Sequence, residues 1–353
     1  MDSRERVGLV MSGAVPDRVP MQDGFWRTTV ERWRSEGLPD NVSPEDYFGT
    51  DEIVRVGGDC SMQFAERVVE ETEHSRTVWG PNGSLQRLLQ TPGGQRPQWL
   101  DYTIKGPDDW RKHRHRMTYN DSRITESALD TYRQGREKGR FIVYSVSGSF
   151  HVTWGKIGME TLLVWMLEDP SLVSDMFAAH AQLCTEVYDG MRRRDLEFDG
   201  AFVGDDLGYK TSSLISPALY RELVHPHHKR LCDHFADDGL TTILHSDGNV
   251  NGLIPGFLDA GFDALNPLEV KAMPDVRDLK REYGNRLVLY GGIDVRKLSG
   301  TREDIEEEIA GKVLVAKEGG GYIFASDHSV PHSVSFDNFC FAMEMLERYG
   351  SYD

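Results

Sequence analysis

The stretch TILHSDGN, residues 242–249, decides the fold of this chain. It begins as a short apolar run with β-branched residues and ends in a polar turn that contains glycine. A buried strand that ends in such a turn is typical of a parallel sheet in which helices connect the strands. The same pattern recurs along the chain, and we predict six parallel strands at 141–145, 200–204, 241–245, 264–266, 287–290 and 321–325.

Segments with helical periodicity lie between these runs. Apolar residues recur every three to four positions, which places an apolar stripe on one face of each predicted helix. The predicted helices are 171–194, 217–235, 250–260, 275–283, 302–317 and 335–349, with Asn249 and Thr301 as N-caps of the third and fifth. Upstream, residues 18–22 with the helix that follows and residues 53–57 supply two more strands. Eight strands with alternating helices predict a closed (β/α)₈ TIM barrel.

Residues 60–105 break this rhythm. Alternating runs at 68–72, 76–79, 85–90 and 99–104, with a Pro-Gly-Gly turn at 92–94, predict antiparallel β-hairpins. The sequence contains no internal repeat, low-complexity segment or Pro/Ser-rich linker. We therefore predict one domain over residues 1–353, with the hairpins as an insertion in the barrel.

The composition excludes several classes of function. A formal charge of −17 and a pI near 5.2 disfavour binding to nucleic acid, which needs clustered cations. No run of 18 or more apolar residues is present and the N-terminus lacks the apolar core of a signal peptide, so we expect a cytoplasmic protein without a membrane span. The four cysteines form no CxxC pair, which argues against a disulfide framework.

Polar residues follow the predicted strands, at the barrel face where catalytic groups of such folds gather. His245 and Asp247 are separated by one residue, so in an extended chain their side chains point the same way. The adjacent Asp205 and Asp206 cannot both face one pocket, and in the alternative to a role in the site one of them caps the helix and the other pairs with Lys210. The remaining residues after strands are Ser147, Glu269, Asp294, Asp327 and His328.

Several of these segments together resemble the uroporphyrinogen decarboxylase superfamily. The resemblance rests on residues 204–231, 244–249, 261–269, 287–294 and 319–331, with DRVP at 17–20 and YFGTD at 47–51. The superfamily contains porphyrinogen decarboxylases and methyltransferases that work with corrinoid proteins. Decarboxylases carry an Arg-rich signature of the form MRQAGR for a substrate with many carboxylates. Here the matching residues 21–26 read MQDGFW, with Asp23 where a cation is wanted, which favours the methyltransferase branch.

The resemblance also implies a metal site. Zinc-dependent methyltransferases of this superfamily carry His-x-Cys after the fifth strand and a second Cys after the last. Here Asp247 follows His245 in place of the first Cys, and His328 takes the position of the second, with Asp327 and His332 as alternatives. The implied zinc ligands are His245, Asp247 and His328, which leave the fourth position open. One carboxylate and two imidazoles would leave the zinc a formal charge of +1 and favour oxygen donors.

We therefore expect a cobalamin-dependent methyltransferase in which zinc acts as a Lewis acid on the oxygen of a small methyl donor such as a methyl ether. The sequence contains no DxHxxG-type cobalamin signature, so a partner corrinoid protein must bring the cobalamin. The alternatives are uroporphyrinogen decarboxylation and a non-catalytic protein that binds a small ligand. The methyl donor and the oligomeric state, a homodimer included, stay open. The residues assigned to this function are Asp205, Asp206, Glu269 and Asp294 as catalytic groups and Asp23, Trp26 and Trp154 as substrate-binding groups.

Overall fold

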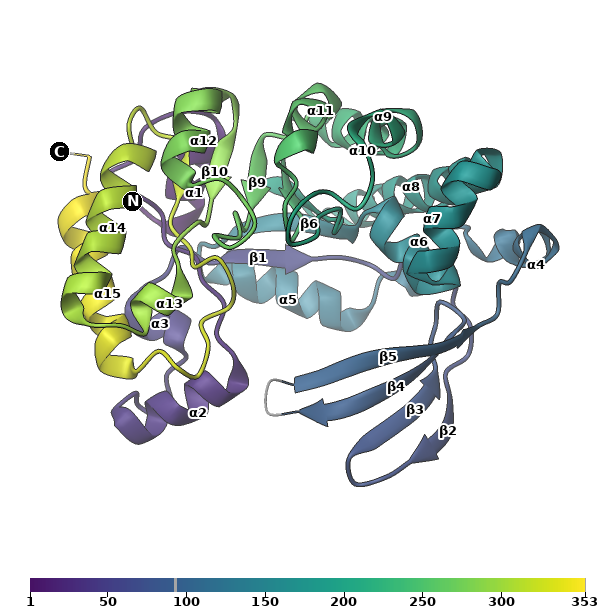
Figure 1. Cartoon of the computed structure of the whole chain (residues 1–353), viewed down its shortest axis with the longest axis horizontal. Coiled ribbons are helices and arrows are strands. Elements are labelled where there is room, and N and C mark those ends of the chain that lie inside the picture. Colours follow the sequence, from purple (N-terminus) through teal and green to yellow (C-terminus); the bar gives the residue numbers. More distant parts are fainter. Residues whose placement is uncertain (92–93, 353) are drawn as a thin grey trace.

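The computed structural model describes residues 1–91 and 94–352, which form two sheets and their connecting helices. One sheet has seven strands and is parallel throughout, and the other has four antiparallel strands. In Figure 1 the helices surround the parallel sheet, and the antiparallel sheet extends away from it. The α/β class and the antiparallel excursion predicted from the sequence are both confirmed.

The parallel sheet has the order β1-β6-β7-β8-β9-β10-β11, so that each strand after β6 pairs with the next one along the chain. All six strands predicted between residues 141 and 325 are present, as is the strand near residue 53. Their bounds are β1 Ile53–Val56, β6 Phe141–Ser147, β7 Gly200–Gly204, β8 Thr241–His245, β9 Ala264–Asn266, β10 Val288–Tyr290 and β11 Tyr322–Ile323.

The predicted eighth strand is not formed as a strand in the described part of the chain. Residues 18–22 make a single parallel bridge, Met21 to Phe324. A longer strand is not formed, because Pro20 has no N–H to donate to a neighbouring strand. Phe324 N donates to Pro20 O (2.8 Å), and Asp51 N, just before β1, donates to Met21 O (2.6 Å). This short segment therefore lies between the two edge strands of the curled sheet.

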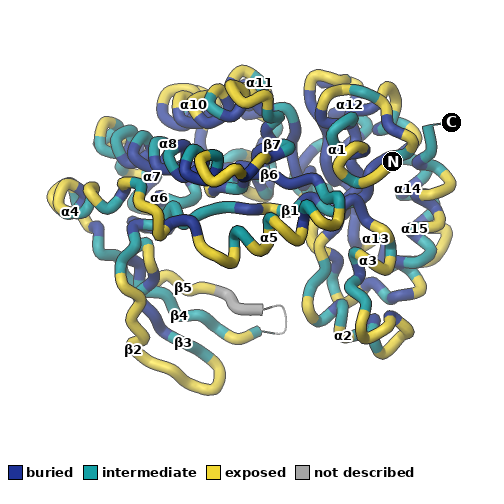
Figure 2. The backbone as a smooth tube through the Cα atoms, turned by 180° about the vertical axis from the view of Figure 1, so that it is seen from behind, coloured by how far each residue is buried: buried dark blue, intermediate teal, exposed yellow. Residues whose placement is uncertain are grey.

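The antiparallel sheet lies between β1 and β6 in the chain and has the order β2-β3-β4-β5. Its strands are β2 Arg67–Glu71, β3 Ser75–Trp79, β4 Ser84–Thr91 and β5 Gly94–Tyr102, close to the predicted hairpins. The first two residues of the predicted turn at 92–94 lie outside the described residues. Figure 2 shows that β2 is exposed along its length, whereas β6 and β7 are buried.

The helices agree in place with the predicted ones, and the Thr301 N-cap is confirmed by a capping box with Asp304. Asn249 is not an N-cap, because a short 3₁₀ turn, η4 (Asn251–Leu253), precedes the α-helix that begins at Ile254. The helices are α1 Ser3–Met11, α2 Arg27–Glu36, α3 Pro44–Phe48, α4 Pro107–His113, α5 Glu126–Glu137, α6 Ser149–Ile157, α7 Met159–Glu168, α8 Pro170–Arg192, α9 Pro217–Leu219, α10 His225–Ala236, α11 Ile254–Ala260, α12 Val276–Tyr283, α13 Val295–Leu298, α14 Arg302–Ala316 and α15 Phe336–Gly350. The shorter turns are η1 Arg114–Arg116, η2 Asp121–Arg123, η5 Gly284–Arg286 and the π-helical η3 Tyr220–Val224.

A compact apolar cluster fills the inside of the curled sheet. Phe141, Phe202 and Ile243 are among its strand residues, and Val7 and Val10 of α1 pack against them. Helix α1 thereby closes the end of the sheet where the strands begin, and the end where the strands finish stays open to polar residues. No helix within the described residues combines the length and apolarity that a membrane crossing requires.

Candidate functional site

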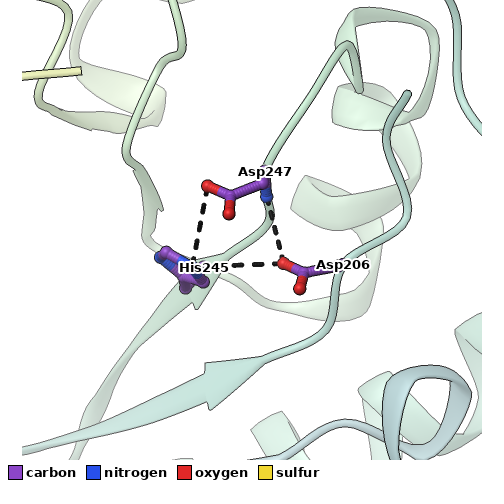
Figure 3. Close-up of side chains that lie close together, drawn as sticks. All are labelled: Asp206, His245 and Asp247. Carbon is purple, nitrogen blue, oxygen red and sulfur yellow. Dashed lines mark hydrogen bonds and ion pairs between the residues drawn. The ribbon is translucent and has the colours of Figure 1, made fainter. Parts of the chain in front are cut away.

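Three side chains meet where β7 and β8 end: Asp206, His245 and Asp247 (Figure 3). The imidazole Nε2 of His245 lies 4.0 Å from Asp206 Oδ1 and 3.8 Å from Asp247 Oδ1. One ligand atom from each of the three lies within 4.8 Å of the others, a spacing that one metal ion can bridge. The prediction that His245 and Asp247 share one side of the chain is therefore confirmed, and Asp206 joins them.

Two loops cross in close contact to bring these groups together. A Cβ on Gly208 would lie 2.3 Å from the carbonyl oxygen of Asp247, so only glycine fits there. The buried Ser246 points away from His245 and accepts a hydrogen bond from Leu207 N through its hydroxyl (2.9 Å). Asp247 N in turn donates to Asp206 Oδ1 (3.2 Å), which fixes one carboxylate against the loop that carries the other.

The ring of His245 is oriented by a neighbouring side chain. Its Nδ1 lies 2.7 Å from Asn266 Oδ1 at the end of β9. An amide oxygen only accepts, so Nδ1 carries the proton and Nε2 keeps a free lone pair directed at the two carboxylates. A partner on the second ring nitrogen is the arrangement that prepares a histidine to ligate a metal.

His151, in the first turn of helix α6, is a fourth side chain in contact with the cluster. Its Nδ1 lies 3.0 Å from Asp206 Oδ2. Burial opposes protonation of His151, but the hydrogen bond and charge of Asp206 outweigh it and raise the pKa of the imidazole. Burial raises the pKa of Asp247, and the nearby Asp206 adds to that effect while His245 opposes it. A bound cation would relieve the repulsion between the two carboxylates.

The predicted metal ligand His328 does not join this cluster. Its Nε2 pairs with Glu269 Oε1 at 3.3 Å, and Glu269 Oε2 accepts from Gly248 N at 2.9 Å. In the described residues the third candidate ligand is Asp206 and not His328. Glu269 therefore connects His328 to the loop of Asp247 and supports the site from behind. The alternatives weighed for His328 lie elsewhere: Asp327 accepts backbone N–H groups from Val295 and Val270, and His332 contacts Thr28 O on the surface.

Asp205 does not face the cluster, which corrects its prediction as a catalytic group. Its side chain is fully buried, and its carboxylate accepts hydrogen bonds from His151 N (2.6 Å) and from His228 Nε2 (2.8 Å). The same carboxylate accepts from Phe150 N, so it caps the first turn of α6. The alternative of a helix cap and an ion pair is thus partly confirmed, although the partner of Asp206 is His151 and not Lys210.

Two further predicted site residues lie away from the cluster. Asp294 is the N-cap of α13, and its carboxylate is held by Arg296 Nε and Nη2, so it neither joins the cluster nor lines the two cavities at this end of the sheet. Trp154 packs its ring against His151, with centroids 4.8 Å apart, and lines neither of the two cavities at this end of the sheet. Trp154 therefore supports His151 and does not meet the predicted substrate position.

Two adjoining cavities open beside the cluster. The larger, about 650 Å³, is lined by His245, Asp247, His328, Trp26 and Asp23, so both N-terminal residues predicted to bind substrate do face it. The smaller, about 350 Å³, shares His245 with the first.

Asp23 is buried in the wall of the larger cavity. It accepts hydrogen bonds from Ser326 N and Oγ. Burial raises the pKa of Asp23 to about 7, so this carboxyl keeps its proton to a higher pH than an exposed aspartate does.

Sequence reasoning missed two groups at this site. His151 lies in the turn after β6 within SFHVTW, which reads as an ordinary helix start. Arg55 lies inside β1 and lines both cavities, and the only signal for it was a cation within the otherwise apolar run IVRV. Among the described residues, Arg55 is the one Lys or Arg that lines either of these two cavities.

One comparison identifies the family, and another shows a solved structure with the same fold. The sequence model described as uroporphyrinogen decarboxylase (URO-D) matches residues 103–349. A methyltransferase from Methanosarcina mazei has the same fold with a TM-score of 0.66 and 16% identity over 99% of both chains. A B12-independent methionine synthase from Shewanella sp. W3-18-1 is more distant, with a TM-score of 0.43 and 9% identity over 62% of this chain and 66% of that one. No curated protein matches the sequence.

Proposed function

Because this chain belongs to the uroporphyrinogen decarboxylase family, we propose that it is a methyltransferase that demethylates a small oxygen-bound methyl donor and passes the methyl group to a corrinoid protein. The observation that carries the proposal is the cluster of Asp206, His245 and Asp247 at the open end of the sheet. The likeness in fold to the methyltransferase from Methanosarcina mazei supports the same branch of the family.

The donor set of the cluster fits a divalent metal such as zinc. Two carboxylates and an imidazole with a free Nε2 are ligands that Zn²⁺ accepts, and three protein ligands leave room for a substrate oxygen. When bound, the ion would supply a Lewis acid for that oxygen. Asp206 in place of His328 changes the charge expected from the sequence, since two carboxylates cancel the +2 of the ion. The site then keeps its preference for hard oxygen donors without the extra positive charge.

The residues around the cluster handle the proton that the reaction needs. Loss of a methyl cation equivalent from a methyl ether leaves an oxygen anion, which must gain one proton to become an alcohol. Asp23 lines the same cavity and has a pKa of about 7, so its carboxyl can hold a proton near neutral pH and give it to that oxygen. His151 stays bound to Asp206 Oδ2 and orients that carboxylate.

Uroporphyrinogen decarboxylation is the second candidate, and Arg55 is the observation that bears on it. A porphyrinogen with many carboxylates needs several cations, and Arg55 alone faces the two cavities within the described residues. Asp206, Asp247 and Asp23 add negative charge to the same space. The charge of the cavity therefore favours a donor with few negative groups.

The test is a methyl-transfer assay with the purified protein, zinc, a reduced corrinoid protein and a panel of methyl ethers. We expect the visible spectrum of the corrinoid to change on methylation, at a rate that falls at least about 100-fold in Asp247→Ala. Asp237→Ala, which removes an exposed carboxylate that lines neither cavity, is the matched control. Failure of every methyl ether, together with formation of coproporphyrinogen from uroporphyrinogen, would replace this proposal by the decarboxylase.

A further inference from the structure

Arg55 is a cation that lines both cavities and has no counter-charge among the described residues. Its side chain extends from β1 into the interior of the curled sheet and is exposed there. No ion pair or hydrogen bond joins its guanidinium to any residue in the described part of the chain. The guanidinium therefore keeps its N–H donors for a ligand in the two cavities, and a negatively charged group is the partner that its planar fork matches best.

The guanidinium is held in place by the ring of Phe202. Its central carbon lies 3.6 Å from the ring centroid, a close cation–π contact. The same ring stacks on the imidazole of His245, with centroids 5.8 Å apart. The two distances together put the guanidinium carbon no more than 9.4 Å from the His245 ring. One small molecule can therefore contact Arg55 and the metal-binding cluster at the same time.

Uncharged donors surround Arg55 in the smaller cavity. The hydroxyls of Ser145 and Ser147 line it and have no hydrogen-bond partner among the residues that the structure describes. Asn82 also lines it, and because Asn82 Oδ1 already accepts from Met62 N, the amide group has N–H donors left over. An oxyanion placed here would receive a charged fork and several neutral donors.

We propose that Arg55 and the smaller cavity form a subsite for a single carboxylate, so that the substrate is a small acid with its methyl ether on the far side, at the cluster of Asp206, His245 and Asp247. This deepens the proposed function and rests on it for the identity of the methyl group. The planar fork of one guanidinium matches one carboxylate. A dianionic phosphate fits worse, because the larger cavity adjoining the subsite is lined by Asp23 and Asp247.

The experiment measures binding to the full-length, zinc-loaded protein by calorimetry, without any corrinoid. The probes are 4-methoxybenzoate and its neutral carboxamide, which have nearly the same shape, and inorganic phosphate. We expect the carboxylate to bind at least about tenfold more tightly than the carboxamide, a difference of about 1.4 kcal/mol. The preference should vanish in Arg55→Met, which keeps the apolar stem over Phe202, and should survive in part in Arg55→Lys. Arg221→Gln removes an exposed arginine elsewhere and should change nothing.

Four results would overturn the subsite, and the first three are no carboxylate binding, equal binding of carboxylate and carboxamide, and a preference that persists in Arg55→Met and so comes from the zinc. Tighter binding of phosphate than of the carboxylate would do the same. Thermal unfolding of each variant separates loss of binding from loss of the fold. A carboxylate preference without any methyl transfer would leave the subsite standing and remove the proposed reaction, whereas methyl transfer without the preference would do the reverse.

Discussion

The neighbours Asp205 and Asp206 have the same chemistry but opposite surroundings, and replacing each by asparagine separates their roles. Asp205 is fully buried and accepts from His228 Nε2 on one oxygen and from His151 N on the other. An asparagine there keeps one acceptor oxygen but turns its NH₂ group toward one of these two donors. A buried donor then loses its partner.

The cost of Asp205→Asn follows from that geometry. A buried hydrogen-bond donor that is left without its partner costs about 1 to 3 kcal/mol. For a chain of 353 residues the entropy of unfolding is about 0.7 kcal/mol per kelvin, so we expect the melting temperature to fall by about 1.5 to 4 °C. Asp206 is partly exposed, and its removal relieves repulsion with Asp247, so Asp206→Asn should melt within about 1 °C of the original protein.

Two measurements test this. Calorimetry of the metal-free proteins gives the melting temperatures, and zinc titration of the folded proteins gives the zinc affinities. Zinc affinity should fall at least about tenfold in Asp206→Asn, since even partners of the ligands change affinity by about 10- to 100-fold. Folded Asp205→Asn should bind zinc within about threefold of the original protein. An Asp205→Asn protein that melts normally and fails to bind zinc would show that the two carboxylates are assigned the wrong way round.

Three more predictions concern the same region. Burial raises the pKa of Asp23 from 3.8 to about 7, so the folded protein keeps a proton that the unfolded chain releases, and the free energy of unfolding should fall as pH rises from about 4 to 7. Melting curves of Asp23→Asn should show a smaller fall over this pH range, and an unchanged fall would contradict the burial argument. His328→Ala should weaken zinc binding by less than about tenfold while Asp247→Ala weakens it by more than about 100-fold, and equal losses by equilibrium dialysis would return His328 to the ligand set. Gly208→Ala places a Cβ 2.3 Å from the carbonyl oxygen of Asp247, so it should displace that loop and lower zinc affinity, and unaltered affinity would show that the loops are free to separate.

The sequence alone predicted the order of strands and helices and the place of His245 and Asp247. Apolar periodicity is a local property, and it located six of the seven strands of the parallel sheet directly. The two-residue spacing of His245 and Asp247 put both side chains on one side of the chain because side chains alternate along a strand. These features depend on neighbours in the chain, which a sequence displays.

Only the tertiary structure decided which other groups join them. Asp206 and not Asp205 faces the cluster because Ser246 Oγ and Gly208 hold the two loops together, and these contacts join residues about 40 positions apart in the chain. His328 pairs with Glu269 and not with the cluster, and this contact also joins segments that are distant in the chain. The contact between Arg55 and Phe202 depends on the curl of the sheet, which brings β1 close to the Phe202 ring. Contacts between distant segments, set by how the loops pack, have no local signal in the sequence, and they determine the composition and charge of the site.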